Sequence, residues 1–265
     1  MKVSSRYHFE YLFLAIVIFL SITGFWDIYF GVDSNPTLYQ HLHVATNFAW
    51  LSLLLLQLSL IARNKHGHHK RIGLSILVIG PLLVATTSLL TVHSAHKGLV
   101  SGRGDFLIVQ NVMVTLELGL IILLAFVVRK RRKLHGYFLL STAILMMGIA
   151  LFFSLIAFVP ALKIEGPETF YRFGTAAMTG AFICLVVGLL FLIRDWRNGW
   201  PLLLAGSFFV LNELLKSMLT EHQLIAPLTQ AVGSMNQSLT FFGIFAVLLA
   251  LLAATGIRIS NQGRA

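Results

Sequence analysis

The stretch that decides the fold is FLIVQNVMVTLELGLIILLAFVV, residues 106–128, which is followed directly by RKRRK, residues 129–133. The first part contains one charged residue, Glu117, and is long enough to cross the roughly 30 Å hydrocarbon core of a bilayer as an α-helix. Clusters of Lys and Arg mark the cytoplasmic ends of such helices. This stretch therefore predicts a membrane-spanning helix that ends at the cytoplasmic surface.

Seven other apolar runs have a similar length and character. The chain is 57% hydrophobic and only 11% charged, against roughly 25% charged residues in a typical soluble protein. The sequence therefore predicts an all-α integral membrane protein with eight transmembrane helices in a single polytopic domain, residues 1–265. The predicted spans are residues 11–30, 43–62, 72–91, 106–128, 137–161, 173–193, 200–219 and 238–257. For residues 200–219, whose apolar character is interrupted by Asn212, Glu213 and Lys216, a re-entrant or shortened helix is the alternative.

The basic residues are distributed unevenly between the two sides of these spans. Fifteen of the 20 Lys and Arg residues fall at the termini and in the second, fourth and sixth loops, namely Lys2, Arg6, Arg63, Lys65, Lys70, Arg71, residues 129–133, Arg194, Arg197, Arg258 and Arg264. By the positive-inside rule both termini are cytoplasmic, which requires an even number of spans. Topology thus accounts for the net charge of +10, and we expect the lipid bilayer, not nucleic acid, as the partner.

A weak internal repeat relates two of the cytoplasmic loops. In each loop a basic run precedes the pattern H-x4-L-S, which begins at His69 in the second loop and at His135 in the fourth. The repeat predicts two related helical hairpins that form a four-helix core within residues 38–161, with one inner histidine in each hairpin. Chance similarity between two basic hairpin loops is the alternative.

Several spans carry polar side chains on one helical face, and in a bilayer such a face requires a partner, a cavity or a function. On the span 43–62 the spacings of four, three and seven residues place His43, Asn47, Trp50 and Gln57 on one face. Polar residues also interrupt the spans 106–128 and 200–219. We expect these faces to converge on a cavity open to the outer surface, lined by Asn47, Trp50, Gln57, Gln110 and Asn111.

Three charged residues lie inside the predicted spans and are candidates for a proton relay. They are Glu117, Glu213 and Lys216. Because burial disfavours the charged form of a carboxyl group, Glu117 is neutral, paired with Lys216 or part of a proton pathway. The spacing i,i+3 makes Glu213 the simpler partner for Lys216. A polar contact that gives helix packing its specificity is the structural alternative for all three.

The ten histidines fall into an outer and an inner group. The outer group, at the predicted outer ends of the spans, consists of His41, His43, His93, His96 and His222. Imidazole is a good ligand for a transition metal (Zn, Cu or Fe), so these five are candidate metal ligands; solvated interfacial histidines are the alternative. The chain has one cysteine, Cys184, which excludes a thiolate cage. In the inner group we interpret the loop at residues 66–69 as a solvated basic loop, with His69 and His135 the better functional candidates.

One set of residues resembles a known family. His43, Trp50, Gln57 and Leu60-Ile61 form the pattern H-x6-W-x6-Q-x2-L-I, which is followed by His69 and Gly73 as H-x3-G and then by Pro81. This pattern is similar to that of a family of bacterial multi-pass membrane proteins of unknown function. The resemblance covers mainly residues 38–93 and implies a location in the bacterial inner membrane, without implying an activity.

A fainter likeness is to the di-haem b-type cytochromes that are reduced by ascorbate. In that family the second and fourth helices of the protein hold one haem and the third and fifth hold another, and His69 and His135 match the latter pair. The fourth span offers no histidine to partner His43, and Lys70 and Arg71 follow His69 directly. The likeness therefore implies at most one b-type haem, held by His43 with His93.

Three classes of function follow from these patterns. The first, which is our hypothesis from the sequence, is a redox or proton-transfer protein that binds a transition metal or haem through the outer histidines. The second is a transporter of a small solute or an ion. The third is an accessory or assembly protein, for which a membrane-protein partner or a second copy of the chain is the candidate partner. No Walker, Rossmann or H-E-x-x-H motif is present, so the sequence does not identify an enzyme.

Overall fold

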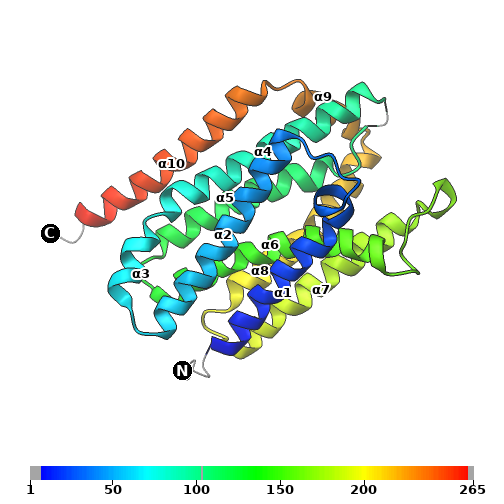
Figure 1. Ribbon diagram of the computed structural model, residues 1–265. Coiled ribbons are helices and arrows are strands. Elements are labelled where there is room, and N and C mark those ends of the chain that lie inside the picture. Colours follow the sequence, from blue (N-terminus) through cyan, green and yellow to red (C-terminus); the bar gives the residue numbers. More distant parts are fainter. Residues whose placement is uncertain (1–6, 103, 262–265) are drawn as a thin grey trace. The chain divides into compact units, whose positions relative to one another are not determined.

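The computed structural model describes residues 7–102 and 104–261, and these residues form an all-helical fold (Figure 1). The protein is 82% helical, and no strand occurs in the part of the chain that is described. The elements are α1 His8–Gly24, the π-helix η2 Trp26–Phe30, α2 Leu38–Ala62, α3 His66–Gly73, α4 Ile76–Val100, α5 Ile108–Val127, α6 Arg132–Phe158, the short 3-10 helix η3 Pro167–Thr169, α7 Arg172–Arg194, α8 Trp200–Glu221, α9 Ile225–Gly233 and α10 Gln237–Asn261.

Seven of the described helices are long and apolar enough to cross a membrane, and they confirm the predicted helical, multi-span class. They are α2, α4, α5, α6, α7, α8 and α10. The run predicted as the first span, residues 11–30, is divided into α1 and η2 at Phe25. At 1.5 Å per residue the 17 residues of α1 are about 26 Å long, which is slightly shorter than the apolar core of a bilayer.

Three segments differ from the boundaries predicted from sequence. Residues 66–73, which include the predicted loop, form the exposed helix α3, whose Lys70 and Arg71 in the last turn favour a helix electrostatically. Helix α4 continues nine residues beyond the predicted end, to Val100, and it therefore includes His93 and His96. Helix α8 is continuous over 22 residues and shows no interruption at its polar positions. The cations Lys2, Arg6, Arg103 and Arg264 and the side chain of Arg258 lie outside the described residues.

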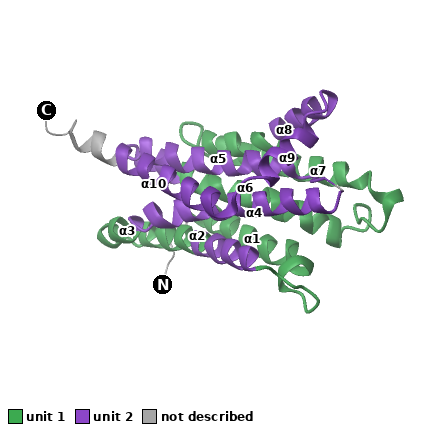
Figure 2. Ribbon diagram, turned by 90° about the horizontal axis from the view of Figure 1, so that it is seen from above, with its two compact units in different colours: residues 1–37, 51–72, 137–210 green, residues 38–50, 73–136, 211–265 purple. Residues whose placement is uncertain are grey.

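The chain divides into two compact units (Figure 2). Unit 1 consists of residues 1–37, 51–72 and 137–210, and unit 2 of residues 38–50, 73–136 and 211–265. The divisions fall at the start of α2 and within α2, α3, α6 and α8. The single polytopic domain and the repeated core at residues 38–161 stay predictions.

In unit 1, helix α1 is held by polar contacts at its first two turns. The hydroxyl of Tyr11 donates to Oγ of Ser59 on α2 over 3.1 Å. Glu10, a buried residue, forms an ion pair of 3.4 Å with Arg194 on α7. The Arg194 guanidinium also lies over the ring of Phe9, 5.0 Å from its centre. These contacts fix α1 against two other helices of the unit.

In unit 2, helix α4 is the central element. It packs against α5, α9 and α10, and α10 runs alongside α4 and α5 (Figure 1). Val92 and Ala95 of α4 form a buried apolar cluster with Ile108, Val109 and Val232. Gln110, Thr115 and Glu117 of α5 and Asn212 of α8 are the buried polar residues of these two helix segments. Pro81 lies inside α4, next to Gly80, which is packed between the side chains of Trp50 and Ile122.

Candidate functional site

A polar link joins α5 to α8 in unit 2. Gln110 on α5 donates from Nε2 to Oε1 of Glu213 over 2.8 Å. Lys216, one turn further along α8, donates from Nζ to Oε2 of the same carboxylate over 3.3 Å. The predicted i,i+3 pair of Glu213 and Lys216 is thus confirmed. Glu213 therefore has a donor on each of its two oxygens.

The carboxyl group of Glu117 is in a different situation. The residue lies at the middle of α5 with 4% of its surface exposed. Among the described residues, neither of its oxygens accepts a hydrogen bond. Asn212 on α8, 1% exposed, lies within interaction range of this carboxyl, yet its Nδ2 also donates to no described group. Glu117 is therefore an acid enclosed in the helix bundle of unit 2 with unsatisfied acceptors.

Hydroxyl groups connect the neighbouring helices at nearby levels. Thr46 on α2 and Thr86 on α4 share a hydrogen bond of 2.8 Å. Thr91 on α4 lies 3.4 Å from the hydroxyl of Thr115 on α5 and also donates to the backbone carbonyl of Asn111 over 3.3 Å. The sequence marks Thr86 as a polar residue on one helical face with His93, but Thr46, Thr91 and Thr115 were not predicted. The sequence does contain a signal, because Thr86 and Thr91 lie within two turns of each other on one apolar helix. The signal is weak, since threonines also bond to the backbone of their own helix and are common in spans.

The residues predicted to line a cavity have separate surroundings. Trp50 is fully buried and its ring packs near Gly80. Asn47 and Asn111 are half-buried, and Gln110 is engaged by Glu213. Gln57 is buried in unit 1, whereas the other residues of the predicted polar face of α2 belong to unit 2. The structure thus brings together Gln110, Glu213 and Lys216, with Glu117 and Asn212 on the same two helices.

The five outer histidines all belong to unit 2 but do not gather into one cluster. Within the described residues, no three His, Cys, Asp or Glu side chains are placed so that they could hold a metal ion. His43 has a buried Nδ1 that bonds to no described group, and His93 packs against the ring of Tyr39 at 5.3 Å between centres. His41, His96 and His222 are exposed. The metal site stays a prediction.

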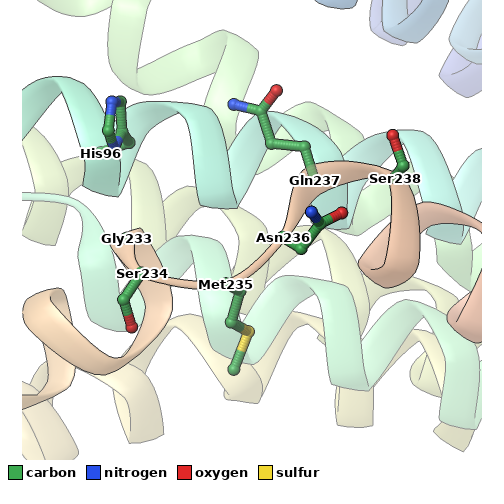
Figure 3. Close-up of a pocket in the computed structure, with 7 residues that line it drawn as sticks. All are labelled: His96, Gly233, Ser234, Met235, Asn236, Gln237 and Ser238. Carbon is green, nitrogen blue, oxygen red and sulfur yellow. The ribbon is translucent and has the colours of Figure 1, made fainter.

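His96 lies beside a surface pocket of about 460 Å³ (Figure 3). The other lining residues come from the end of α9 and the turn into α10, namely Gly233, Ser234, Met235, Asn236, Gln237 and Ser238. Asn236 caps α10, since its Oδ1 accepts from the backbone N–H of Leu239 over 3.0 Å. The lining contains no carboxylate and no second imidazole, so it does not supply a metal-ligand set around His96.

His69 and His135, the two functional candidates of the inner group, lie in different units. Nδ1 of His135 lies 2.7 Å from the backbone carbonyl of Ala125, and its ring packs edge-on against Phe126. His135 therefore caps the C-terminal end of α5 across the turn into α6. His69 is half-buried in α3 of unit 1. Haem ligation by this pair stays a prediction.

Sequence analysis also missed the buried acid of unit 1. Glu10 lies one residue before the predicted start of the first span and close in sequence to Lys2 and Arg6, so its position does not mark it as an intramembrane charge. Its partner Arg194 was assigned only to the basic loops. An acid that directly precedes an apolar run, in a chain with so few acids, is the signal that could have identified the pair.

No family model, no curated protein and no solved structure matches the chain. The resemblances to the bacterial membrane-protein family and to the di-haem cytochromes therefore stay predictions. The class of the protein follows from its fold alone: the described residues are all-helical, with seven helices long and apolar enough to cross a membrane, as in a multi-pass membrane protein.

Proposed function

We propose that the protein is a membrane transporter that moves a small charged solute through unit 2, with Glu117 as the group that binds it. The observation that carries this proposal is the enclosed carboxyl of Glu117, whose two oxygens have no hydrogen-bond donor in the described part of the chain. An ionisable residue inside a membrane segment is costly, and it usually marks an ion or proton pathway. Transport, one of the classes predicted from sequence, therefore fits the site better than a metal-based activity.

The neighbouring polar groups support this proposal. The link between Gln110, Glu213 and Lys216 lies on the same two helices as Glu117 and Asn212, about two turns nearer to the N-terminal end of α5. Thr91 and Thr115 add hydroxyl groups between α4 and α5. Together these side chains give a solute hydrogen-bonding groups on three helices of one unit.

The topology proposed with this function has eight spans. In it α1 and η2 together form the first span, both termini are cytoplasmic, and the protein lies in the bacterial inner membrane. The support is the uneven distribution of Lys and Arg and the apolar character of residues 11–30. Together α1 and η2 extend from residue 8 to residue 30, which is long enough to cross a bilayer.

Haem or metal binding is kept as a second candidate because of His43. Its buried Nδ1 has no described partner, and a ring nitrogen of this kind is a ligand for iron or copper. His93 is the one other outer histidine that is not exposed. A metal ion held by His43 and His93 would need further ligands, because no third His, Cys, Asp or Glu among the described residues is placed to complete the site.

A flux assay tests the transport proposal. Purified protein is reconstituted into liposomes that contain a pH-sensitive dye, and a potassium diffusion potential is imposed. In parallel, uptake of radioactive sodium is measured. We expect a flux above that of empty liposomes, and we expect Glu117→Gln to abolish it. Glu165→Gln, the same change in an exposed loop, should retain the flux. An unchanged flux in Glu117→Gln contradicts the proposal.

A further inference from the structure

We infer that the site at Glu117 takes one elementary positive charge, as a proton or as a monovalent cation, and excludes divalent cations and anions. This inference rests on the proposed function, because it names the class of solute that the same site binds. It is carried by the charges and the unsatisfied polar atoms around Glu117 in unit 2.

The first argument is the charge balance of the surrounding elements. Glu213 and Lys216 neutralise each other on α8. Helix α5 has no other charged residue, and neither α9 nor the described side chains of α10 carry any. On α4 the titratable groups are His93, His96 and Lys97, all in its last two turns. An ionised Glu117 is thus left with one uncompensated negative charge in an apolar interior.

An uncompensated buried charge is strongly unfavourable, so the stable state of this site contains one added positive charge. A divalent cation would change the excess charge from −1 to +1, which is just as unfavourable. A monovalent anion would double the excess negative charge. The remaining acids and bases of unit 2 near these helices lie at helix ends or on α2. They are Asp105 just before α5, where its Oδ1 accepts from the backbone N–H of Leu107, His135 and the cations at residues 129–133 beyond the end of α5, Glu221 and His222 at the exposed end of α8, and His41 and His43 on α2.

The second argument is the kind of unsatisfied atom. Three buried oxygens on α5 lack a described donor, namely Oε1 of Gln110 and both carboxyl oxygens of Glu117. Residues 110 and 117 are seven apart and therefore lie on one face of the helix. Oxygen acceptors are satisfied by a bound proton, by an ammonium group or by an alkali cation. The single unsatisfied donor nearby, Nδ2 of Asn212, is placed to donate to the Glu117 oxygen that does not hold the added charge.

Labelling with dicyclohexylcarbodiimide tests this inference on the full chain in detergent. The reagent converts a protonated carboxyl in an apolar environment into a stable N-acylurea, and mass spectrometry then identifies the labelled residue. Labelling is followed over a pH series, with sodium, potassium, ammonium, magnesium or calcium chloride at matched ionic strength. Glu10 is the matched control, because it is equally buried but paired with Arg194. Glu117→Gln gives the background.

We expect Glu117 to be labelled and Glu10 to be protected, with labelling of Glu117 decreasing as the pH rises. If a monovalent cation is the solute, that cation slows the labelling about tenfold when present at ten times its dissociation constant. If the solute is a proton, the labelling rate of Glu117 changes with pH and none of the added cations changes it. Protection by magnesium or calcium equal to that by monovalent cations overturns the inference. The inference is also overturned if, at every pH, Glu117 is labelled no faster than Glu10. Labelling as expected without flux in liposomes would contradict the transport proposal alone.

Discussion

Gln110 on α5 and Glu213 on α8 are joined by a hydrogen bond of 2.8 Å, although 103 residues separate them in the sequence. The bond is accepted by a carboxylate that also receives the ammonium group of Lys216. Hydrogen bonds to charged groups are stronger than those between neutral groups, and inside a helix bundle they fix which faces of two helices meet. This contact therefore sets the register of α5 against α8, on which the position of Asn212 near Glu117 depends.

Replacing Gln110 by Leu should destabilise unit 2. The change removes the donor from a mostly buried carboxylate, which costs about 2 kcal/mol. Thermal unfolding of the purified protein in detergent measures the effect. Gln230→Leu is the control, because it makes the same change at an exposed position of α9. Equal unfolding temperatures for the two variants would show that the hydrogen bond does not contribute to stability.

The ion pair of Glu213 and Lys216 should show a measurable but modest coupling. Both side chains are partly exposed, so solvent weakens the attraction, and we expect about 1 kcal/mol in a double-mutant cycle. The cycle uses Glu213→Gln, Lys216→Gln and the double variant, each followed by thermal unfolding. An additive double variant would contradict the pairing.

The ion pair of Glu10 and Arg194 should respond asymmetrically to its two single substitutions. Arg194→Gln leaves a buried carboxylate without its cation, whereas Glu10→Gln leaves a guanidinium that is about a third exposed and can be hydrated. We expect Arg194→Gln to lower stability by about 2 kcal/mol more than Glu10→Gln does. Unfolding by heat or denaturant in the same detergent measures the difference. The opposite order would show that Glu10 does not depend on Arg194.

Cysteine accessibility should distinguish eight spans from seven. In a Cys184→Ala background, single cysteines are placed at Ser4, Ser34 and Glu168, and intact cells are treated with a membrane-impermeant maleimide. We expect labelling at positions 34 and 168 from outside, and labelling at position 4 only after permeabilisation. Labelling of position 4 in intact cells would mean that α1 and η2 do not cross the membrane.

An absorption spectrum and elemental analysis of the same purified sample test the second candidate function. A Soret band that changes with dithionite would indicate haem, and stoichiometric zinc, copper or iron would indicate a metal site. We expect any such ligand to be lost in His43→Ala and in His93→Ala, and to be kept in His66→Ala, which changes the exposed helix α3. A sample without haem and without metal would exclude this candidate.

The sequence was sufficient to predict the helical class and most helix positions, because length and apolarity decide membrane spans. It also identified Glu117 and the local pair of Glu213 and Lys216, since both depend on position within one helix. The contacts of Gln110 with Glu213, of Thr46 with Thr86 and of Glu10 with Arg194 are long-range. Such contacts depend on which helices pack together, and the periodicity of a single helix does not contain that information.

The histidines show a second limit of prediction from sequence, because here a predicted grouping is not found. Their positions at predicted helix ends suggested a common site, but a position along a helix does not determine the direction of a side chain. In unit 2 His93 packs on Tyr39, while His96 lies beside the turn into α10. Helix α4 also extends beyond its predicted end, which places both residues inside the helix.

Pro81 has a mechanical consequence for helix α4. Because proline has no backbone N–H, the carbonyl of Leu77 lacks its usual donor within the helix, and neighbouring Gly80 adds no side chain to stiffen the turn. The helix is therefore easiest to bend at this point, about one turn before Thr86. A bend there would swing the part of α4 that carries Thr86 and Thr91 while leaving its hydrogen bonds on either side intact. The hydroxyl contacts of α4 with α2 and α5 thus lie on the part of the helix that such a bend would move.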